Sequence, residues 1–120
     1  MFEIEFYEDK NGKKEVYEYI LGLKNSNKHE DTMKLKKIDM YLDLLSLYGL
    51  KLREPYIKKV DNEIWELRPL RDRILFAGYC NNSFVMLSVF MKKTNKTPRS
   101  EIIKAKKYLK DYKLRRGQDE

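Results

Sequence analysis

The sequence of 120 residues has little of the residue types from which most metal and nucleophilic sites are built. It contains one cysteine, Cys80, and one histidine, His29, so it has no internal disulfide and no Cys/His zinc site. We expect His29 to face solvent or to begin a helix. The five glycines are scattered and form no phosphate-binding motif. If the protein is an enzyme, its chemistry therefore depends on Arg, Lys, Glu, Tyr or Ser.

Long hydrophobic segments are missing as well. No run of about 18 apolar residues is present, which is the length a membrane-spanning helix needs. The acidic, alternating start "MFEIEFYEDK" is unlike a signal peptide. With a single cysteine, these absences predict a cytoplasmic protein.

Charge is abundant and unevenly distributed. The net charge is +7, yet the first nine residues contain four carboxylates. From Lys92 to Arg116 there are eleven basic residues, opposed only by Glu101 and Asp111. This asymmetry has two interpretations, which the sequence leaves open: a surface for a polyanion, most simply nucleic acid, or a solvated helix face.

Hydrophobic periodicity in the first half predicts a strand and two helices. "FEIEFYE" alternates as a half-buried strand does. Apolar residues then recur at helical spacing in two stretches. The first is Val16, Tyr19, Ile20 and Leu23, and the second, within 31–48, is Leu35, Ile38, Leu42 and Leu45. Gly49 is a plausible stop, so we expect an αα-hairpin.

The second half predicts an antiparallel meander followed by a basic helix. The expected strands are 56–60, 63–68, 73–80 and 84–93, joined by tight polar turns. Thr97 is expected as the N-cap of the last helix and Pro98 as its first residue. The apolar stripe of that helix is Ile102, Ala105, Leu109 and Tyr112.

Together these elements predict an α+β fold: an N-terminal strand, a helical hairpin, a mostly antiparallel sheet and a C-terminal basic helix. We expect one domain over residues 1–116, with 117–120 as a frayed tail. The helices are expected to cover one face of the sheet and to leave the other face open for binding.

Two segments, "PYIKKVDNEIWELRPLRDRILFAGYC" and "LSVFMKKTNKTPRSEIIKAKKYL", resemble the HigB-like, phage-derived branch of the RelE toxin superfamily. The likeness runs from about Gly49 to Tyr112. Its parts, in order, are a Pro-containing lead with Lys-Lys, then Trp-Glu-Leu-Arg, Arg-Ile-Leu-Phe, Phe-x-Lys-Lys-Thr and Thr-Pro-x-x-Glu-Ile. Each part alone is a weak signal, and their shared order makes the resemblance specific.

The resemblance implies a small RelE-like fold and the toxin of a type II toxin–antitoxin pair. Such toxins are endoribonucleases without a metal or other cofactor, and they cut mRNA, commonly in the ribosomal A site. A helix-turn-helix antitoxin holds them inactive, and operator DNA would be met only through that antitoxin. The alternatives are a non-catalytic basic nucleic-acid-binding module, an attenuated toxin, or a subunit whose basic helix docks an acidic protein.

Cleaving RNA without a metal requires the 2′-OH to attack the adjacent phosphate, and guanidinium groups can neutralise the phosphorane that forms. On the strand "EIWELR", alternation puts Trp65 and Leu67 in the core and Glu66 and Arg68 on the open face. The latter two form either a simple ion pair or part of a site. The resemblance aligns Arg73 with an arginine that many relatives place on the scissile phosphate.

Other candidate residues follow from the same segments. Lys92 and Lys93 end a strand, so one of them should reach the site. Phe90 stacks on a base or belongs to the core. Ser88 stands where many relatives have histidine, which leaves the general base open, with Glu66 as a candidate. The further residues expected to bind RNA are Lys58, Lys59, Lys106, Lys107 and Lys110.

Overall fold

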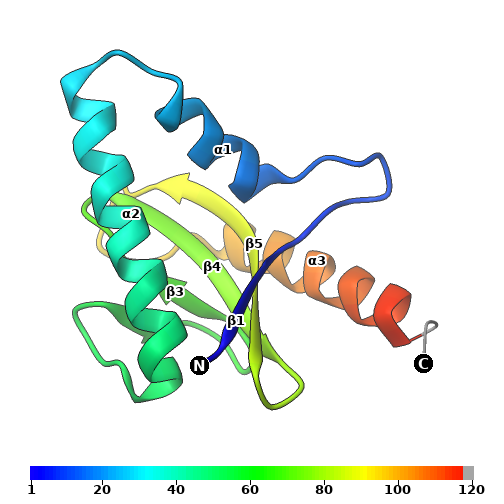
Figure 1. Ribbon diagram of the computed structural model, residues 1–120. Helices are drawn as coiled ribbons and strands as arrows, with labels where there is room; N and C mark the ends of the chain where they lie inside the picture. The colour runs from blue at the N-terminus through cyan, green and yellow to red at the C-terminus, as the bar shows by residue number, and fades with distance from the viewer. Residues whose placement is uncertain (118–120) are drawn as a thin grey trace.

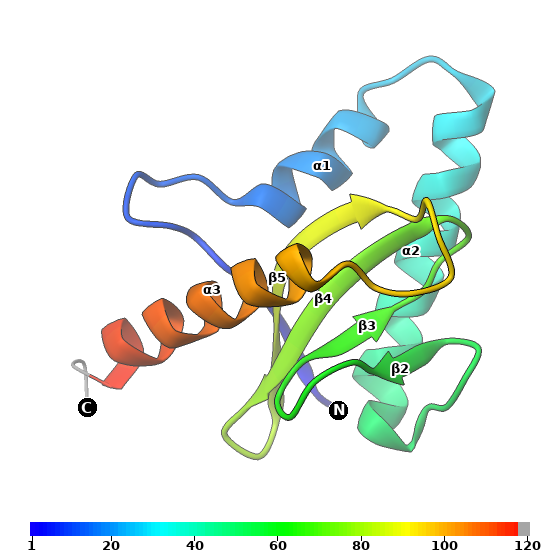
Figure 2. The same ribbon diagram turned by 180° about the vertical axis from the view of Figure 1, so that it is seen from behind.

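The computed structural model, which describes residues 1–117, has one five-stranded sheet with helices on both faces (Figures 1 and 2). In chain order the elements are β1 (Glu3–Phe6), α1 (Glu15–Lys24), α2 (His29–Tyr48), a short 3-10 turn (Gly49–Lys51), β2 (Ile57–Lys59), β3 (Trp65–Leu67), β4 (Asp72–Tyr79), β5 (Ser83–Met91) and α3 (Arg99–Gly117). The strand order is β1-β5-β4-β3-β2. β1 pairs parallel with β5, and the other pairs are antiparallel. The α+β prediction is confirmed.

The helical hairpin covers one face of the sheet, as the periodicity predicts. Ile38 and Leu45 of α2 are fully buried against the sheet, and Phe2, Ile4 and Phe6 pack on the same core cluster. His29 is the first residue of α2 and is exposed. The chain turns after α2 at Gly49, whose φ is +59°. A Cβ at this position would lie 2.5 Å from Cε2 of Phe2, so backbone angle and space both require glycine.

The expectation that the second face is open is wrong, because α3 packs on it. Ala105, Leu109 and Tyr112 of α3 are buried in a second core cluster. The sheet supplies Leu75, Ala77, Val85 and Leu87 to that cluster. Runs such as "ILFA" in β4 are apolar at successive positions, which is the pattern of a strand buried on both faces. Figure 2 shows α3 crossing β5 and β4, with β2 and β3 beside it.

A register shift in β4 and β5 changes which residues of β5 face α3. Leu75 pairs with Ser88, but Phe76 pairs with Met86, so Leu87 is an extra residue. Before this bulge Val85 belongs to the α3-side cluster, and after it Phe90 packs there. The bulge therefore places Phe90 on the same face as its pairing partner, Arg73.

The ends of the last helix also differ from expectation. α3 begins at Arg99, and the carbonyl of Pro98 accepts a hydrogen bond from the backbone N–H of Ile102. α3 continues through Gly117. The rest of the predicted tail, 118–120, lies outside the described residues. No helix in residues 1–117 is long and apolar enough to span a membrane.

Candidate active site

Glu66 is the centre of the polar cluster on the α3 side of the sheet. It pairs with Lys58 of β2 and with Leu75 of β4, so its side chain is on the α3 side. The connection from β5 to α3 folds back over it, and the Thr97 hydroxyl donates a hydrogen bond of 2.6 Å to Glu66 Oε2. Glu66 is only 3% exposed. The expectation that it lies on an open face is thus wrong, because this connection covers it.

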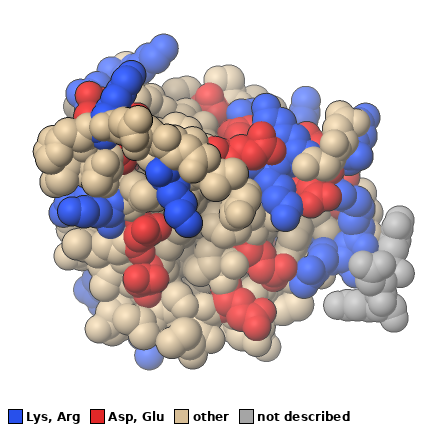
Figure 3. Space-filling model, turned by 45° about the horizontal axis from the view of Figure 1, so that its top comes forward, with Lys and Arg blue, Asp and Glu red and all other residues tan. Residues whose placement is uncertain are grey.

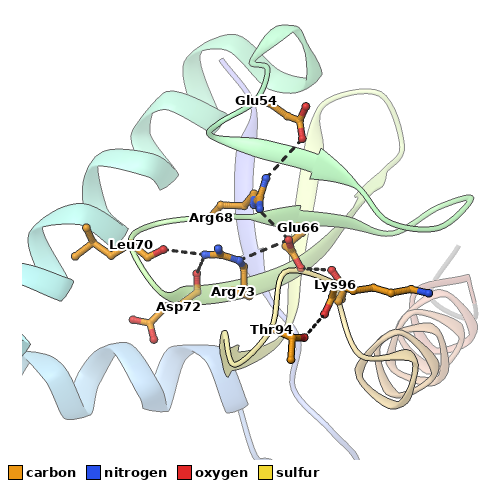
Figure 4. A network of polar contacts seen from close by, with 9 residues as sticks. Glu54, Glu66, Arg68, Leu70, Asp72, Arg73, Thr94 and Lys96 are labelled. Atoms are coloured by element: carbon orange, nitrogen blue, oxygen red, sulfur yellow. Dashed lines mark hydrogen bonds and ion pairs between the residues drawn. The ribbon is translucent and has the colours of Figure 1, made fainter.

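Two guanidinium groups converge on one oxygen of this carboxylate (Figure 4). Nε of Arg68 lies 3.4 Å from Glu66 Oε1, and Nε of Arg73 lies 3.6 Å from the same atom. Nη1 of Arg68 is also 3.6 Å from Glu54 Oε1, but the Glu54 side chain is 63% exposed. That outer contact is screened by water and contributes little to stability.

Arg73 is held by the turn that precedes it. Its Nη1 group donates hydrogen bonds of 2.9 Å to the carbonyl oxygens of Leu70 and Asp72. Leu70 has a φ of +55°, a left-handed conformation that costs a non-glycine residue about 1–2 kcal/mol. The hydrogen bond to its carbonyl helps to offset that cost. The guanidinium thereby fixes the turn, and the turn fixes the guanidinium.

The two guanidinium groups differ in burial. Arg73 is 6% exposed, and burial lowers the pKa of its guanidinium even though the nearby Glu66 carboxylate opposes that change. Arg68 Nε is buried and makes no hydrogen bond within residues 1–117. Two guanidinium groups thus share the Glu66 carboxylate, and the Nε of Arg68 leaves a buried donor available to an oxyanion.

Ser88 and Phe90 lie on the same face of β5 and differ in burial. Ser88 is fully buried, and its Oγ has no hydrogen-bond partner within residues 1–117. Phe90 pairs with Arg73, is partly buried and packs on the α3-side cluster. This packing favours the core interpretation of Phe90 for at least part of its ring.

Lys92 and Lys93 follow the end of β5 and differ in position. The Lys92 N–H donates a bond of 2.7 Å to the carbonyl of Arg71, and the Lys92 carbonyl accepts one of 3.1 Å from Arg71 Nη2. Continued alternation from Phe90 puts Lys92 on the face of Arg73. Lys93 is exposed, whereas Lys92 is partly buried. Of the two lysines, Lys92 is thus the one placed on the same face of the sheet as Arg73.

The structure divides the two lysines of β2 between opposite faces. Lys58 pairs with Glu66 and shares its face. Lys59 pairs with Trp65, and its ammonium lies 5.9 Å from the centre of the Trp65 ring. Trp65 and Leu67 belong to the core beneath α1 and α2, as predicted, although Trp65 is only partly buried. The structure therefore brings Lys58 to the cluster and turns the ammonium of Lys59 away from it.

Much of the positive charge of α3 is paired within the molecule. Its ion pairs to other elements are Lys104–Glu15 at 3.1 Å, Lys106–Asp61 at 3.0 Å, Lys113–Glu63 and Arg116–Glu5 at 3.2 Å. In Figure 3, basic and acidic side chains are interleaved toward the C-terminal end of the chain. Of the three helix lysines expected to bind RNA, Lys107 and Lys110 are exposed and have no ion-pair partner within residues 1–117.

A second polar cluster lies on the opposite face of the sheet, around the side chain of Asp72, whose backbone carbonyl accepts a hydrogen bond from Arg73. The Tyr19 hydroxyl donates a bond of 2.8 Å to Asp72 Oδ1, and Lys34 Nζ is 3.8 Å from the same oxygen. Burial, and then the Asp72 carboxylate, raise the pKa of Tyr19. This cluster could not be predicted from the sequence, because its members come from α1, α2 and β4 and no local pattern joins them.

The role of Thr97 also differs from the N-cap that the sequence predicts. Because α3 begins two residues later and the Thr97 hydroxyl donates to Glu66, this side chain fixes the covering loop instead. A Thr-Pro pair before a helix is a common capping signal, and the sequence contains no signal for the long-range contact between Thr97 and Glu66.

The structure is thus that of a small α+β protein whose sheet carries two arginines around one buried glutamate. The chain belongs to the family described as Phage derived protein Gp49-like (DUF891), a HigB-like toxin family of the RelE superfamily, whose model matches residues 12–110. The match confirms the resemblance seen in the second half and extends it over the helical hairpin. No curated protein matches the chain.

Proposed function

We propose that this protein is the toxin of a type II toxin–antitoxin pair and acts in the cytoplasm as a metal-independent endoribonuclease on ribosome-bound mRNA. Its partners would be mRNA, the ribosome and a helix-turn-helix antitoxin. Membership of a HigB-like toxin family supports this proposal. The observation that carries it is the convergence of Arg68 and Arg73 on the buried Glu66 carboxylate.

The proposed reaction is attack of the RNA 2′-oxygen on the adjacent phosphorus. A bond forms between the 2′-oxygen and phosphorus as the bond from phosphorus to the 5′-oxygen breaks, which leaves a 2′,3′-cyclic phosphate and a 5′-hydroxyl. The 2′-OH gives up a proton, and the 5′-oxygen receives one. Extra negative charge builds up on the non-bridging oxygens, and preorganised donors stabilise it without reorganising.

Arg73 is the proposed principal ligand of that phosphate. Its Nη1 is bound by two carbonyls and its Nε faces Glu66, whereas its Nη2 makes no hydrogen bond within residues 1–117. Arg68 and Lys92 would add further positive charge. Glu66 is best suited to orienting the two arginines, because its oxygens are already occupied by Thr97 and both guanidinium groups.

A second candidate is a non-catalytic RNA-binding module or an attenuated toxin. The observation that favours it is the shortage of free acid–base groups at the cluster. Ser88 is buried where relatives with histidine would have a titratable side chain, and Glu66 is engaged on both oxygens. Such a protein would bind RNA through the same face and cut it slowly or not at all.

The test is to add the purified protein to preformed ribosome–mRNA complexes and to map cuts by primer extension. We expect cuts within the ribosome-bound codon, and we expect them to persist when a chelator is added after assembly, with ribosome integrity followed separately. If mRNA is bound but stays intact, the second candidate is correct. If cleavage stops with chelator while ribosomes remain intact, the reaction requires a metal.

A further inference from the structure

We propose that a pocket beside Glu66 holds one unpaired nucleoside of the RNA next to the bond that is cut, an inference that rests on the proposed function. The pocket lies between the end of β2 and the loop before α3. It has a volume of about 200 Å³ and includes Lys58, Val60, Glu66, Asn95, Lys96 and Ile102 in its lining. It is separate from the larger hollow between Asp61 and Lys110 farther along α3.

The size of the pocket limits what it can hold. Pockets that enclose whole drug-sized ligands measure roughly 300–1,000 Å³. At about 200 Å³ this pocket is too small for such a ligand, and it suits one planar group with its edges at the mouth. A single base from an unstacked strand is a group of that kind, and unpaired bases are the usual targets of sequence-specific RNA recognition.

The lining distinguishes between the parts of a nucleotide. Val60 and Ile102 are partly buried and offer apolar contact for the face of a base. Glu66 is the acidic residue of this lining, and its carboxylate is already paired with Arg68 and Arg73, so it offers no cation to a phosphate in the interior. Asn95 is exposed, and its amide can both donate to and accept from the edge of a base. The base therefore occupies the interior, and the phosphates stay at the rim.

The rim carries the charges that those phosphates need. Lys58 points to the same face as Glu66, and Lys96 follows from the covering loop. Both lysines are exposed and have no ion-pair partner within residues 1–117, unlike Lys106 on α3. The Thr94 hydroxyl donates a bond of 3.0 Å to the Lys96 carbonyl, which braces the loop at this point (Figure 4).

The pocket and the arginine cluster share a wall, which gives the pocket its place in the reaction. Glu66 lines the pocket, and its carboxylate contacts Arg68 and Arg73. A strand whose base occupies the pocket thus continues toward the two guanidinium groups. The pocket would select the nucleoside beside the cut, whereas the guanidinium groups act on the phosphate.

The first arm of the test measures binding alone. A short single-stranded RNA with 2′-O-methyl groups, which cannot attack its own phosphates, is titrated into ¹⁵N-labelled protein at several salt concentrations. We expect the amide signals of Val60, Asn95 and Ile102 to shift. Replacing Lys58 and Lys96 by Ala should reduce the magnitude of the negative slope of log K against log salt by about 1.4, or about 0.7 for each lost contact with a single strand. The matched control, Lys24→Ala with Lys36→Ala, should leave the slope unchanged.

The second arm measures selectivity. Asn95→Ala should change the base preferred beside the cut on ribosome-bound mRNA, and Asn81→Ala, an exposed asparagine in the β4–β5 turn, should not. Two results would overturn the proposal. One is that RNA shifts only the signals of α3. The other is that a poly-glutamate peptide shifts the pocket signals with equal affinity, which would assign the pocket to acidic protein segments. If the pocket binds RNA as expected but the wild type cuts no mRNA, the pocket stands and the nuclease proposal fails.

Discussion

At the scale of single residues, Glu66 is the side chain on which the site depends. A buried carboxylate is costly unless it is paired and hydrogen-bonded. Glu66 has Thr97 on one oxygen and two guanidinium groups near the other. It therefore fixes the two cations on which the proposed phosphate chemistry depends, and its own burial depends on them in return.

The neighbouring Trp65 provides a test of how the faces of β3 are assigned. Its ring packs on the core under α2 but stays partly exposed, so Trp65→Ala should lower the free energy of unfolding by about 2–3 kcal/mol, less than for a fully buried aromatic. Urea unfolding measures the loss. Leu114→Ala, at a residue 58% exposed on α3, is the control and should change stability by less than about 0.5 kcal/mol. Equal stability of the two variants would contradict the assignment.

At the scale of elements, the segment between β5 and α3 is what closes the site. It is joined to β3 through the hydrogen bond from Thr97 to Glu66. Thr97→Val keeps the shape of the side chain and removes the donor, so it should destabilise the protein by about 1.5–3 kcal/mol, as for other hydrogen bonds to charged groups. Thr97→Ser keeps the hydroxyl and should cost less. Chemical denaturation compares them, and identical values would show that this bond does not hold the loop.

The other end of α3 is joined to the chain start by a bond that depends on pH. The Tyr7 hydroxyl donates a bond of 2.7 Å to Asp111 Oδ2, and this bond, together with Arg115, lowers the pKa of Asp111 from its ordinary 3.8. The resulting stability is present above that ordinary pKa and is lost as pH falls through the lowered value. The effect should stay below about 1 kcal/mol, because the pair is partly exposed.

Asp111→Asn tests this bond. Between about pH 6 and pH 2, the wild type should lose stability more steeply than the variant, since only the wild type has a carboxylate to protonate here. Unfolding midpoints measured across that range give the comparison. Parallel pH profiles would show that Asp111 contributes nothing to acid sensitivity.

Local patterns in the sequence predicted the helices and strands well, but they predicted poorly which segment covers which face of the sheet. Alternation placed Trp65 and Leu67 opposite Glu66, and helical spacing gave the stripe Ala105–Leu109–Tyr112, because both depend only on near neighbours. Patterns of this kind do not report a loop folding back over a strand. They therefore gave Glu66 an open face and did not indicate the bulge that turns Phe90 toward Arg73.

At the scale of the whole molecule, the fold cancels much of the charge asymmetry of the sequence. The acidic first strand lies beside the end of the basic last helix, where Glu5 pairs with Arg116 at 3.2 Å. Glu15 at the start of α1 pairs with Lys104, and Asp61 pairs with Lys106. Part of the positive charge of the segment from Lys92 to Arg116 is thus paired inside the molecule. Its exposed cations without an ion-pair partner in residues 1–117 are Lys93, Lys96, Arg99, Lys107 and Lys110, of which the last two lie on the outer part of α3.

This pairing predicts unequal roles for the lysines of α3. Lys107→Ala and Lys110→Ala should each reduce the magnitude of the slope of log K against log salt, for single-stranded RNA binding, by about 0.7. Lys106→Ala should reduce that magnitude less, because Asp61 already pairs with Lys106. Binding titrations at several salt concentrations measure the slopes. The cleavage rate of the bound complex should change little in each case. Equal slopes for all three variants would contradict the role given to the ion pair.

The most direct test of the central claim is the single-turnover cleavage rate at saturating ribosome for Arg73→Ala. Loss of a donor to the developing oxyanion should slow cleavage by about 10²–10³-fold while binding is nearly kept. Arg73→Lys should restore little, because a point charge does not replace a planar fork. Circular dichroism and unfolding free energies establish that the variants are folded, since Arg73 also holds the turn at Leu70. A folded Arg73→Ala that cleaves at the wild-type rate would contradict the account and leave Arg73 with a structural role only.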